Sequence, residues 1–507
     1  MKLAKSLLLS SAVGLTAVAS AQAADLPYRK AAPVEYVRVC DFTGAGYFYI
    51  PGTDTCLKIG GYLRADFAYI EPTNAFFPSV NATTLGGATP GVGLAGRGTA
   101  AGTIISSANR AQTGIRAEGR VDVDARTQTA YGTLRTYVRF QADAAGGNFT
   151  QNPAGAAISP PTQGQLGSVS GIAPRATNVA YVDKGFIQFA GFTAGRVQSF
   201  FDFYADNYNF EGIANSDASN EVFAYTATFG GGFSATIAVE DATTRRNPSN
   251  IRNTVNGQFD GFGATNVSYG GEQIPDFVGA VRLDQAWGAV QLSAAYHQIN
   301  AVENGAFTNT INGTTRENDQ NGFAVQAGIQ IKLPMLAAGD DIWLEGAYQN
   351  GAYLYQDSSS NLNAGFNSLA VGGFVHQDTD AIAFRNANGS YSTSLSEGFS
   401  VMGALHHYFT PNFSDVLFGS YEEVSYGNRA KNLDWTLGGL GDASEYRIGN
   451  QFIFTPVNNL SVGLEVIYMH IDQTLAHNPG VAATALPVGI AKDPDAFEGR
   501  VRIERDF

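Results

Sequence analysis

The sequence predicts an all-β protein, a transmembrane antiparallel β-barrel of about sixteen strands. Three observations lead to this fold class. Apolar and polar residues alternate with a period of two, the alternating segments are about ten residues long, and the connections between them are short and long in turn. A strand of ~10 residues, tilted in the membrane, is long enough to cross a bilayer. Closure is required because an open sheet edge would leave unpaired backbone groups in lipid.

The chain begins with the pattern of a secretory signal peptide, predicted over residues 1–23. Lys2 and Lys5 precede a short apolar run, and Ala21-Gln22-Ala23 has the small–polar–small form of a cleavage site. A membrane anchor is the alternative. The apolar run is shorter than the ~20 residues of a helical span, and no second long apolar segment follows. We therefore expect export from the cytoplasm.

The composition is typical of strands and turns rather than helices. The 507 residues include 59 Gly, 33 Phe and 23 Tyr but only 4 Met. The mean hydropathy of −0.08 excludes a helical membrane protein. A net charge of −14 argues against nucleic acid as a partner. It suits a surface that meets an anionic outer leaflet through divalent cations, although a soluble acidic protein would show the same balance.

Residues 24–56 are predicted to form an N-terminal segment on the periplasmic side, and this segment holds the two cysteines of the chain. Cys40 and Cys56 precede the first clear strand of an exported chain, so a disulfide is expected. Closing this loop stabilises the fold by roughly 3 kcal/mol in the chain-entropy model. A redox or metal site is the alternative, but two thiols without a nearby His do not make a zinc site.

The clearest alternation runs from residue 115 to residue 125. One face is small and apolar, and the opposite face carries Arg116, Glu118, Arg120, Asp122 and Asp124. After a four-residue break the pattern resumes, with Arg135 and Arg139 on the polar face. This pair of segments predicts a hairpin. The sixteen predicted strands, which assign residues 57–507 to the barrel, are 57–70, 114–126, 131–143, 178–189, 192–200, 221–229, 233–241, 276–285, 289–299, 321–333, 341–354, 397–409, 413–424, 444–455, 460–471 and 495–507.

The connections are sorted by length, as in an up-and-down barrel with tight periplasmic turns and long external loops. A soluble β-sandwich would not sort its loops so regularly. The short connections are 127–130, 190–191, 230–232, 286–288, 334–340, 410–412 and 456–459. The long ones are 71–113, 144–177, 201–220, 242–275, 300–320, 355–396, 425–443 and 472–494.

Sixteen strands enclose a lumen that side chains cannot fill. The inward faces are charged, and an unpaired buried charge costs several kcal/mol, so water must occupy the space. The architecture therefore predicts a water-filled pore. The basic residues expected on its wall are Arg64, Arg116, Arg120, Arg135 and Arg139.

Several segments carry a resemblance to a known family. They are Ala24–Pro27, Pro33–Cys40, Phe48–Leu57, Gly60–Tyr62, Phe192–Arg196 and the C-terminal Phe507. The chain resembles the alphaproteobacterial general porins, trimeric porins of the outer membrane. The resemblance implies a homotrimer, passive diffusion of small hydrophilic solutes and ions, contact with outer-membrane lipids and lipopolysaccharide, no cofactor, and a third external loop folded into the lumen.

The C-terminus looks like the assembly signal of outer-membrane barrels, a terminal Phe preceded by apolar residues at every second position. Phe497, Val501 and Ile503 fit this pattern before Phe507. Arg505 breaks the alternation, which weakens the match without removing it.

The third long connection is more aromatic than the other long loops, as expected of a loop that packs on an inner wall. It carries four acids that we expect at the constriction, namely Asp202, Asp206, Glu211 and Asp217. Acids on the loop opposite arginines on the wall would create a transverse field that orients polar solutes. The aromatic rings could pack on the wall or stack on sugars.

Three other functions compete with a general channel. A barrel enzyme needs a catalytic constellation, and the six His lie in no H-E-x-x-H motif, nor does the chain contain a G-x-S-x-G elbow. The chain is therefore not expected to be an enzyme. A channel specific for sugars or oligosaccharides, and a surface barrel that binds a host or phage, remain alternatives. The preference for anions or cations stays open.

Overall fold

The computed structural model describes most of the barrel and part of the loops. The described residues are 38–40, 43–71, 75–78, 102–105, 112–150, 177–246, 252–255, 258–259, 266–269, 272–304, 317–359, 379–385, 391–431, 441–474 and 493–507. The predicted signal peptide and the first part of the predicted N-terminal segment lie outside these residues.

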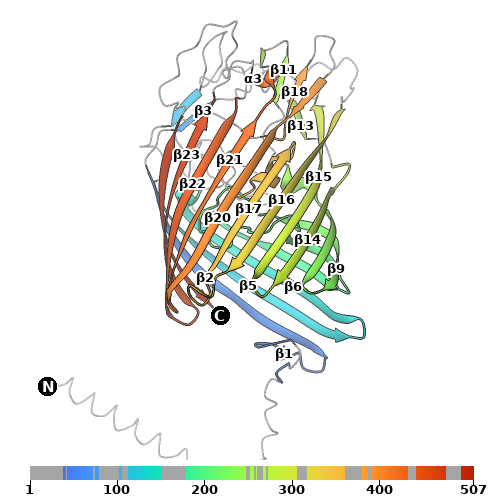
Figure 1. The fold of residues 1–507 in the computed structure, drawn as a ribbon, viewed down its shortest axis with the longest axis vertical. Helices are drawn as coiled ribbons and strands as arrows, with labels where there is room; N and C mark the ends of the chain where they lie inside the picture. The colour runs from blue at the N-terminus through green and yellow to red at the C-terminus, as the bar shows by residue number, and fades with distance from the viewer. Residues whose placement is uncertain are drawn as a thin grey trace, which may run out of the picture.

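The main sheet closes into an antiparallel barrel (Figure 1). Strand β2 pairs with β5 on one side and with β24 on the other, from Tyr62↔Asp506 to Ile70↔Glu498, which closes the ring. The fold class predicted from the sequence is confirmed. Within the described residues the barrel strands are β2 (Thr55–Ile70), β5 (Thr113–Thr129), β6 (Gly132–Gly147), β7 (Thr177–Phe189), β8 (Phe192–Gln198), β9 (Ser219–Gly230), β10 (Phe233–Glu240), β14 (Asp276–Gln285), β15 (Gly288–Asn304), β16 (Glu317–Lys332), β17 (Asp341–Asn350), β20 (Glu397–Thr410), β21 (Phe413–Ser425), β22 (Ala443–Val457), β23 (Leu460–Gln473) and β24 (Asp495–Asp506).

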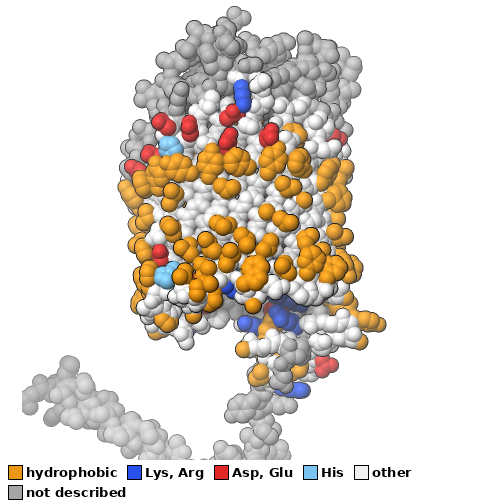
Figure 2. All heavy atoms as spheres, viewed as in Figure 1, with side chains coloured by type: hydrophobic (Ala, Val, Ile, Leu, Met, Phe, Trp, Pro, Cys, Tyr) orange, Lys and Arg blue, Asp and Glu red, His pale blue; other side chains and the backbone are white. Residues whose placement is uncertain are grey.

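The alternation of the sequence becomes an outer apolar face and an inner polar face. On β23, Leu464 and Val466 are 46% and 48% exposed on the outside, whereas Glu465 between them is 1% exposed. On the face shown in Figure 2, apolar side chains cover the outside of the barrel and gather toward both ends of the strands. Two sets of exposed aromatic residues lie near the ends of the strands, as in membrane barrels. Those near the long loops include Tyr69, Phe277, Phe323, Phe399 and Phe497, and those near the short turns include Phe192, Phe229, Phe233, Phe409 and Phe454.

Strand β17 is shorter than the sequence pattern predicts. The prediction ran to residue 354, but the strand ends at Asn350 because Gly351 takes a φ of +68° and turns the chain. The next residues form the short helix α2 (Tyr353–Gln356), whose four side chains are all buried. Tyr353 and Leu354 are apolar because they pack inside the protein, and the sequence pattern did not distinguish this from an outward face.

The remaining described elements belong to the long loops and the N-terminal segment. Among the described residues, no helix has the length and apolar character needed to cross a membrane. These elements are β3 (Ala75–Pro78), β4 (Gly102–Ile105), η2 (Asn148–Thr150), η3 (Ala242–Arg245), β11 (Arg252–Val255), β12 (Gln258–Phe259), β13 (Asn266–Tyr269), β18 (Ala381–Arg385), β19 (Tyr391–Leu395) and α3 (Asn428–Lys431).

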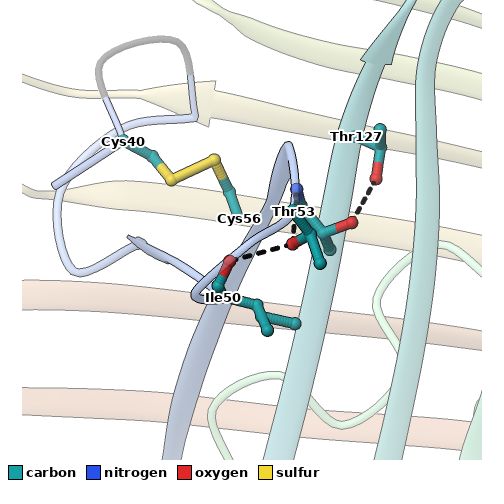
Figure 3. Close-up of a disulfide and its surroundings, with 6 residues drawn as sticks. Cys40, Ile50, Thr53, Cys56 and Thr127 are labelled. Carbon is teal, nitrogen blue, oxygen red and sulfur yellow. Dashed lines mark hydrogen bonds between the residues drawn. A yellow bond between two sulfur atoms is a disulfide. The ribbon is translucent and has the colours of Figure 1, made fainter. Parts of the chain in front are cut away.

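The expected disulfide between Cys40 and Cys56 is present, with the two Cα atoms 6.1 Å apart (Figure 3). Cys56 lies within β2, which begins at Thr55, rather than before the first strand as the sequence suggested. The disulfide holds the two-residue strand β1 (Phe48–Tyr49) against the start of β2. Because β24 pairs with β2 only from Tyr62 onward, β1 covers part of the edge that β24 leaves free.

The C-terminal Phe507 lies next to the same end of β2. Its backbone N–H donates to the carbonyl oxygen of Gly61 at 3.0 Å. Gly61 has a φ of +152°, and a β-carbon there would lie 2.0 Å from the carbonyl oxygen of Arg120. Arg505, which breaks the apolar alternation, is exposed and donates to the carbonyl oxygen of Asn459 at 3.1 Å. A polar residue is tolerated at this position because it binds the neighbouring turn.

Candidate functional site: the lumen between loop L3 and the wall

The third long connection, residues 199–218 between β8 and β9, is called loop L3 here. Its first part is bound to the inner wall by side chains of distant strands. Gln291 of β15 donates to the carbonyl oxygen of Asp202 at 3.0 Å, and Gln326 of β16 donates to that of Phe201 at 3.0 Å. The carboxylate of Glu345 on β17 accepts from the backbone N–H of Tyr204 at 2.8 Å. These polar side chains bind backbone groups that β-pairing does not satisfy.

The second part of L3 is held by strands near the end of the chain. Glu465 of β23 accepts from the backbone N–H of Phe210 at 2.6 Å. Arg447 of β22 donates to the carbonyl oxygen of Gly212 at 2.7 Å. Because L3 begins at β8 and contacts strands from β15 to β24, it lies inside the barrel and narrows the lumen.

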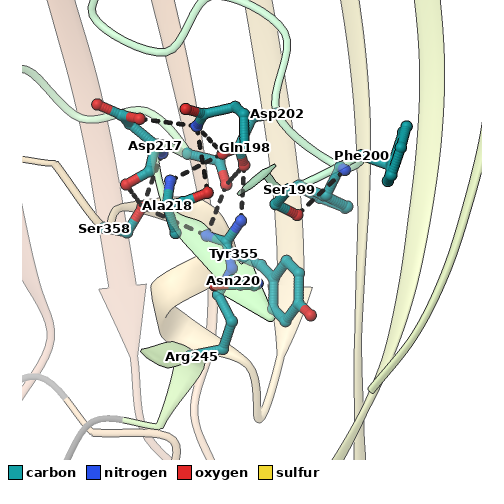
Figure 4. A network of polar contacts seen from close by, with 12 residues as sticks. Gln198, Ser199, Phe200, Asp202, Asp217, Ala218, Asn220, Arg245, Tyr355 and Ser358 are labelled. Atoms are coloured by element: carbon teal, nitrogen blue, oxygen red, sulfur yellow. Dashed lines mark hydrogen bonds and ion pairs between the residues drawn. The ribbon is translucent and has the colours of Figure 1, made fainter. Parts of the chain in front are cut away.

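Asp202, one of the four expected constriction acids, does not line the lumen. Figure 4 shows the Arg245 guanidinium directed at its carboxylate, and the two groups lie 2.6 Å apart with side chains 0% and 1% exposed. The same carboxylate accepts from Ser216 Oγ at 2.6 Å and from the backbone N–H of Ala218 at 2.8 Å. Arg245 also donates to the carbonyl oxygen of Leu354 at 2.8 Å, so the pair joins three external loops.

Glu211 is also buried away from the lumen, in an ion pair with Arg500 of β24. The other two acids do line the lumen, and they are Asp206 and Asp217. Burial raises the pKa of the Asp206 carboxyl well above its usual range, and the charge of Asp217 adds to the effect. Burial and the charge of Asp202 likewise raise the pKa of Asp217.

Four of the five expected arginines stand together on the wall formed by β2, β5 and β6, where they line the same cavity. Arg64 pairs with Glu118 at 2.5 Å, Arg116 with Asp66 at 2.6 Å, and Arg139 with Asp122 at 2.7 Å. Arg120 donates to the amide oxygen of Gln141 at 2.9 Å.

Arg135 is not part of this group. It pairs with Asp124 at 2.9 Å, close to the N-terminal segment, where Tyr47 also donates to the Asp124 carboxylate at 2.8 Å. Its place near the start of β6 puts it at the rim with the short turns. The sequence could not show this, because alternation gives the face of a residue but not its distance from the constriction.

The cavity between the wall and L3 has a volume of about 1200 Å³. Charged side chains from both sides line it. The basic ones are Arg64, Arg116, Arg120, Arg139, Lys184, Arg196 and Arg502. The acidic ones are Asp143, Asp183, Asp206, Asp217, Glu221 and Glu504. Such a surface requires water and admits polar solutes.

Comparisons with known proteins agree with this architecture. A family model described as a porin subfamily matches residues 25–499. The chain belongs to this family. Porin Omp2b of Brucella suis biovar 1 (strain 1330) is 28% identical over 382 residues, which are 75% of this chain and 82% of the relative. Porin Omp2b of Brucella melitensis biotype 1 (strain ATCC 23456) is 29% identical over the same length.

A solved structure with the same fold is the outer membrane channel DcaP of Acinetobacter baumannii. The TM-score is 0.50 at 12% sequence identity, and the match covers 90% of this chain and 99% of the other. The family and the fold together identify an outer-membrane porin, a channel for small solutes.

The lumen residues of this porin that sequence reasoning missed include Asp183, Lys184 and Arg502. Lys184 and Asp183 are neighbours on β7, and alternation would place one of them outside. Arg502 of β24 lies over the ring of Phe210 with its guanidinium carbon 3.9 Å from the ring centre. Its charged face was visible in the sequence, but nothing there indicated that it meets L3. No group of three or more His, Cys, Asp or Glu able to hold a metal ion occurs in the described part of the chain.

Proposed function

We propose that this porin is a passive, general channel whose constriction lies between L3 and the arginines of β2, β5 and β6. The observation that carries the proposal is the polar cavity lined by Arg64, Arg116, Arg120 and Arg139 on the wall and by Asp206 and Asp217 on L3. Opposite charges on two sides of a narrow aqueous passage align water and polar solutes, and they disfavour apolar ones. Positioning and charge suffice for this function, so we infer no enzymatic activity.

The experiment is reconstitution of the purified protein. In a planar bilayer it should give ohmic single-channel steps, and in liposomes it should admit small neutral sugars at rates that fall smoothly with their size. A protein that inserts and folds but conducts no ions would contradict the proposal.

A channel specific for sugars is the competing function, because several aromatic rings line the cavity. Guanidinium groups already lie over three of these rings, those of Tyr62, Phe149 and Phe210. The Arg120 guanidinium carbon lies 4.6 Å from the ring centre of Tyr62, and the Arg116 carbon lies 5.2 Å from that of Phe149. Rings covered in this way are not free to stack on a sugar, which supports the general channel.

We also propose that the porin assembles as a homotrimer in contact with outer-membrane lipids and lipopolysaccharide. The outer face of β5 supports this proposal, because it carries the small residues Ala117, Gly119 and Ala125, which allow another barrel to approach closely. The protein extracted in mild detergent should have the mass of three chains, and heating in SDS should convert it to the monomer. A monomer in mild detergent would contradict this assembly.

We further propose that the signal peptide is cleaved when the porin is exported. Residues 1–23 would be removed on export, leaving residues 24–56 on the periplasmic side ahead of the barrel. N-terminal sequencing of the protein purified from outer membranes should begin at Ala24. A mature protein that retains Met1 would contradict cleavage.

A further inference from the structure

Strand β7 contains a bulge that faces the constriction. Its pairing with β6 runs Arg139↔Lys184 and then Phe140↔Val182, so Asp183 is an extra residue without a partner. Val182 is 45% exposed on the outer face. The side chains of Asp183 and Lys184 both point inward, because the Asp183 carboxylate lies 3.6 Å from the Arg139 guanidinium and the Lys184 ammonium donates to the Gln198 amide oxygen at 3.1 Å. In a regular strand two consecutive side chains point to opposite faces. The bulge therefore turns a second charged side chain into the lumen.

Lys184 differs from the other cations of the cavity in its partners. Among the described residues it is the lining cation with no carboxylate oxygen within 4.0 Å, and its ammonium donates to the amide oxygen of Gln198 at 3.1 Å. Each of the other six lining cations has a carboxylate within that distance. They are Arg64, Arg116, Arg120, Arg139, Arg196 and Arg502.

The nearby acids are already engaged elsewhere. Asp183 lies 3.6 Å from the Arg139 guanidinium and 4.0 Å from that of Arg120. Asp217 of L3 is separated from Lys184 by the amide of Gln198, whose nitrogen donates to the Asp217 carboxylate at 2.8 Å. The Lys184 ammonium has three N–H donors, and one of them donates to Gln198. Two donors and one positive charge therefore remain for a solute.

We propose that Lys184 determines the ion preference of the constriction by binding small anions in transit. Chloride, phosphate and short carboxylates share the chemistry that this site would recognise, a compact negative charge that accepts hydrogen bonds. The neighbouring Arg120 is also available to such an anion, because its carboxylate contacts are long, at 3.9 Å and 4.0 Å. This inference rests on the proposed channel function.

The test removes the positive charge at residue 184 and then adds a charge of either sign at the same residue. Lys184→Cys is reconstituted in a planar bilayer under a KCl gradient, and its reversal potential is measured before and after reaction with a methanethiosulfonate reagent. A cationic reagent restores the positive charge and an anionic reagent reverses it. The two native cysteines are bonded to each other and do not react. The matched control is Lys58→Cys, an exposed lysine outside the cavity.

Lys184→Cys should lower the chloride-to-potassium permeability ratio about two- to threefold at 0.1 M salt, the effect of a unit charge ~7 Å from the ion path. The cationic reagent should return the ratio to that of the wild type, and the anionic reagent should lower it further. At 1 M salt the differences should shrink, because the screening length falls to ~3 Å. The control should keep the wild-type ratio throughout.

If the channels still conduct but the chloride-to-potassium permeability ratio does not change with the charge at residue 184, the proposal for Lys184 is wrong. It would leave the channel function intact. A wild-type protein that forms no channels would instead contradict the proposed function itself. A modest structural role for Lys184 would change the conductance equally with either reagent, so only opposite shifts support the inference.

Discussion

Removing the Arg245 guanidinium should destabilise L3 and make the open channel noisy. The Asp202–Arg245 pair joins L3 to the loop between β10 and β14, and both side chains are fully buried at a separation of 2.6 Å. In Arg245→Met the Asp202 carboxylate keeps only neutral donors, among them Ser216 and the backbone of Ala218. Breaking a buried pair from one side costs about 3–5 kcal/mol.

We expect this loss of stability to affect the position of L3 rather than the barrel, because the barrel strands keep their hydrogen bonds. The uncompensated carboxylate can regain water only if L3 moves into the lumen. We expect flickering closures of the single channel and closure at a lower voltage, whereas the temperature at which heat in SDS dissociates the proposed trimer changes little.

The matched variant is Asp202→Asn combined with Arg245→Met, which removes both charges. Replacing both partners of a buried pair costs much less than removing one, so the double variant should conduct more quietly than Arg245→Met alone. Arg245→Met currents as quiet as those of the wild type, or a double variant as noisy as the single one, would refute this reasoning.

Three further outcomes are expected. Exchange of Cys40 and Cys56 for Ser should leave conductance intact, since the barrel closes without the disulfide, and unreduced, unfolded wild type should take up no maleimide. Gly61→Ala should lower the yield of folded oligomer on SDS gels, because its β-carbon meets the neighbouring backbone, whereas Gly146→Ala, with open space around it, should not. Burial raises the pKa of Asp217, so acidification through that pKa removes its negative charge and should favour anions. The reversal potential of Asp217→Asn should lack this pH-dependent component. If Asp217→Asn and the wild type showed the same dependence of reversal potential on pH, this prediction would be wrong.

The barrel could be predicted from sequence because its determinants are local. The period of two is imposed by lipid on one face and water on the other, and each strand shows it independently of its neighbours. The order of the strands then follows from connection lengths. Gly351 ended β17 earlier than predicted because its side-chain-free backbone turned inward, where apolar residues are also buried.

The constriction could be predicted only in outline, because its determinants are not local. In the sequence, Asp202 and Glu211 look like Asp206 and Asp217, because all four are acids of the same loop. The arginines that pair with Asp202 and Glu211 lie far away in the sequence. Arg245 follows Asp202 by 43 residues, and Arg500 follows Glu211 by 289. Lys184 was missed because a bulge, invisible in a hydrophobic pattern, shifts the phase of the alternation by one residue.

The most direct test of the central claim compares the two sides of the constriction. The reversal potential in a KCl gradient is measured for Arg116→Ser/Arg120→Ser/Arg139→Ser and for Asp217→Asn. The account predicts a shift toward cations for the wall variant and a shift toward anions for the loop variant, both largest at low salt. Unchanged reversal potentials in both variants, with folded oligomers confirmed, would show that ions do not pass between this wall and L3.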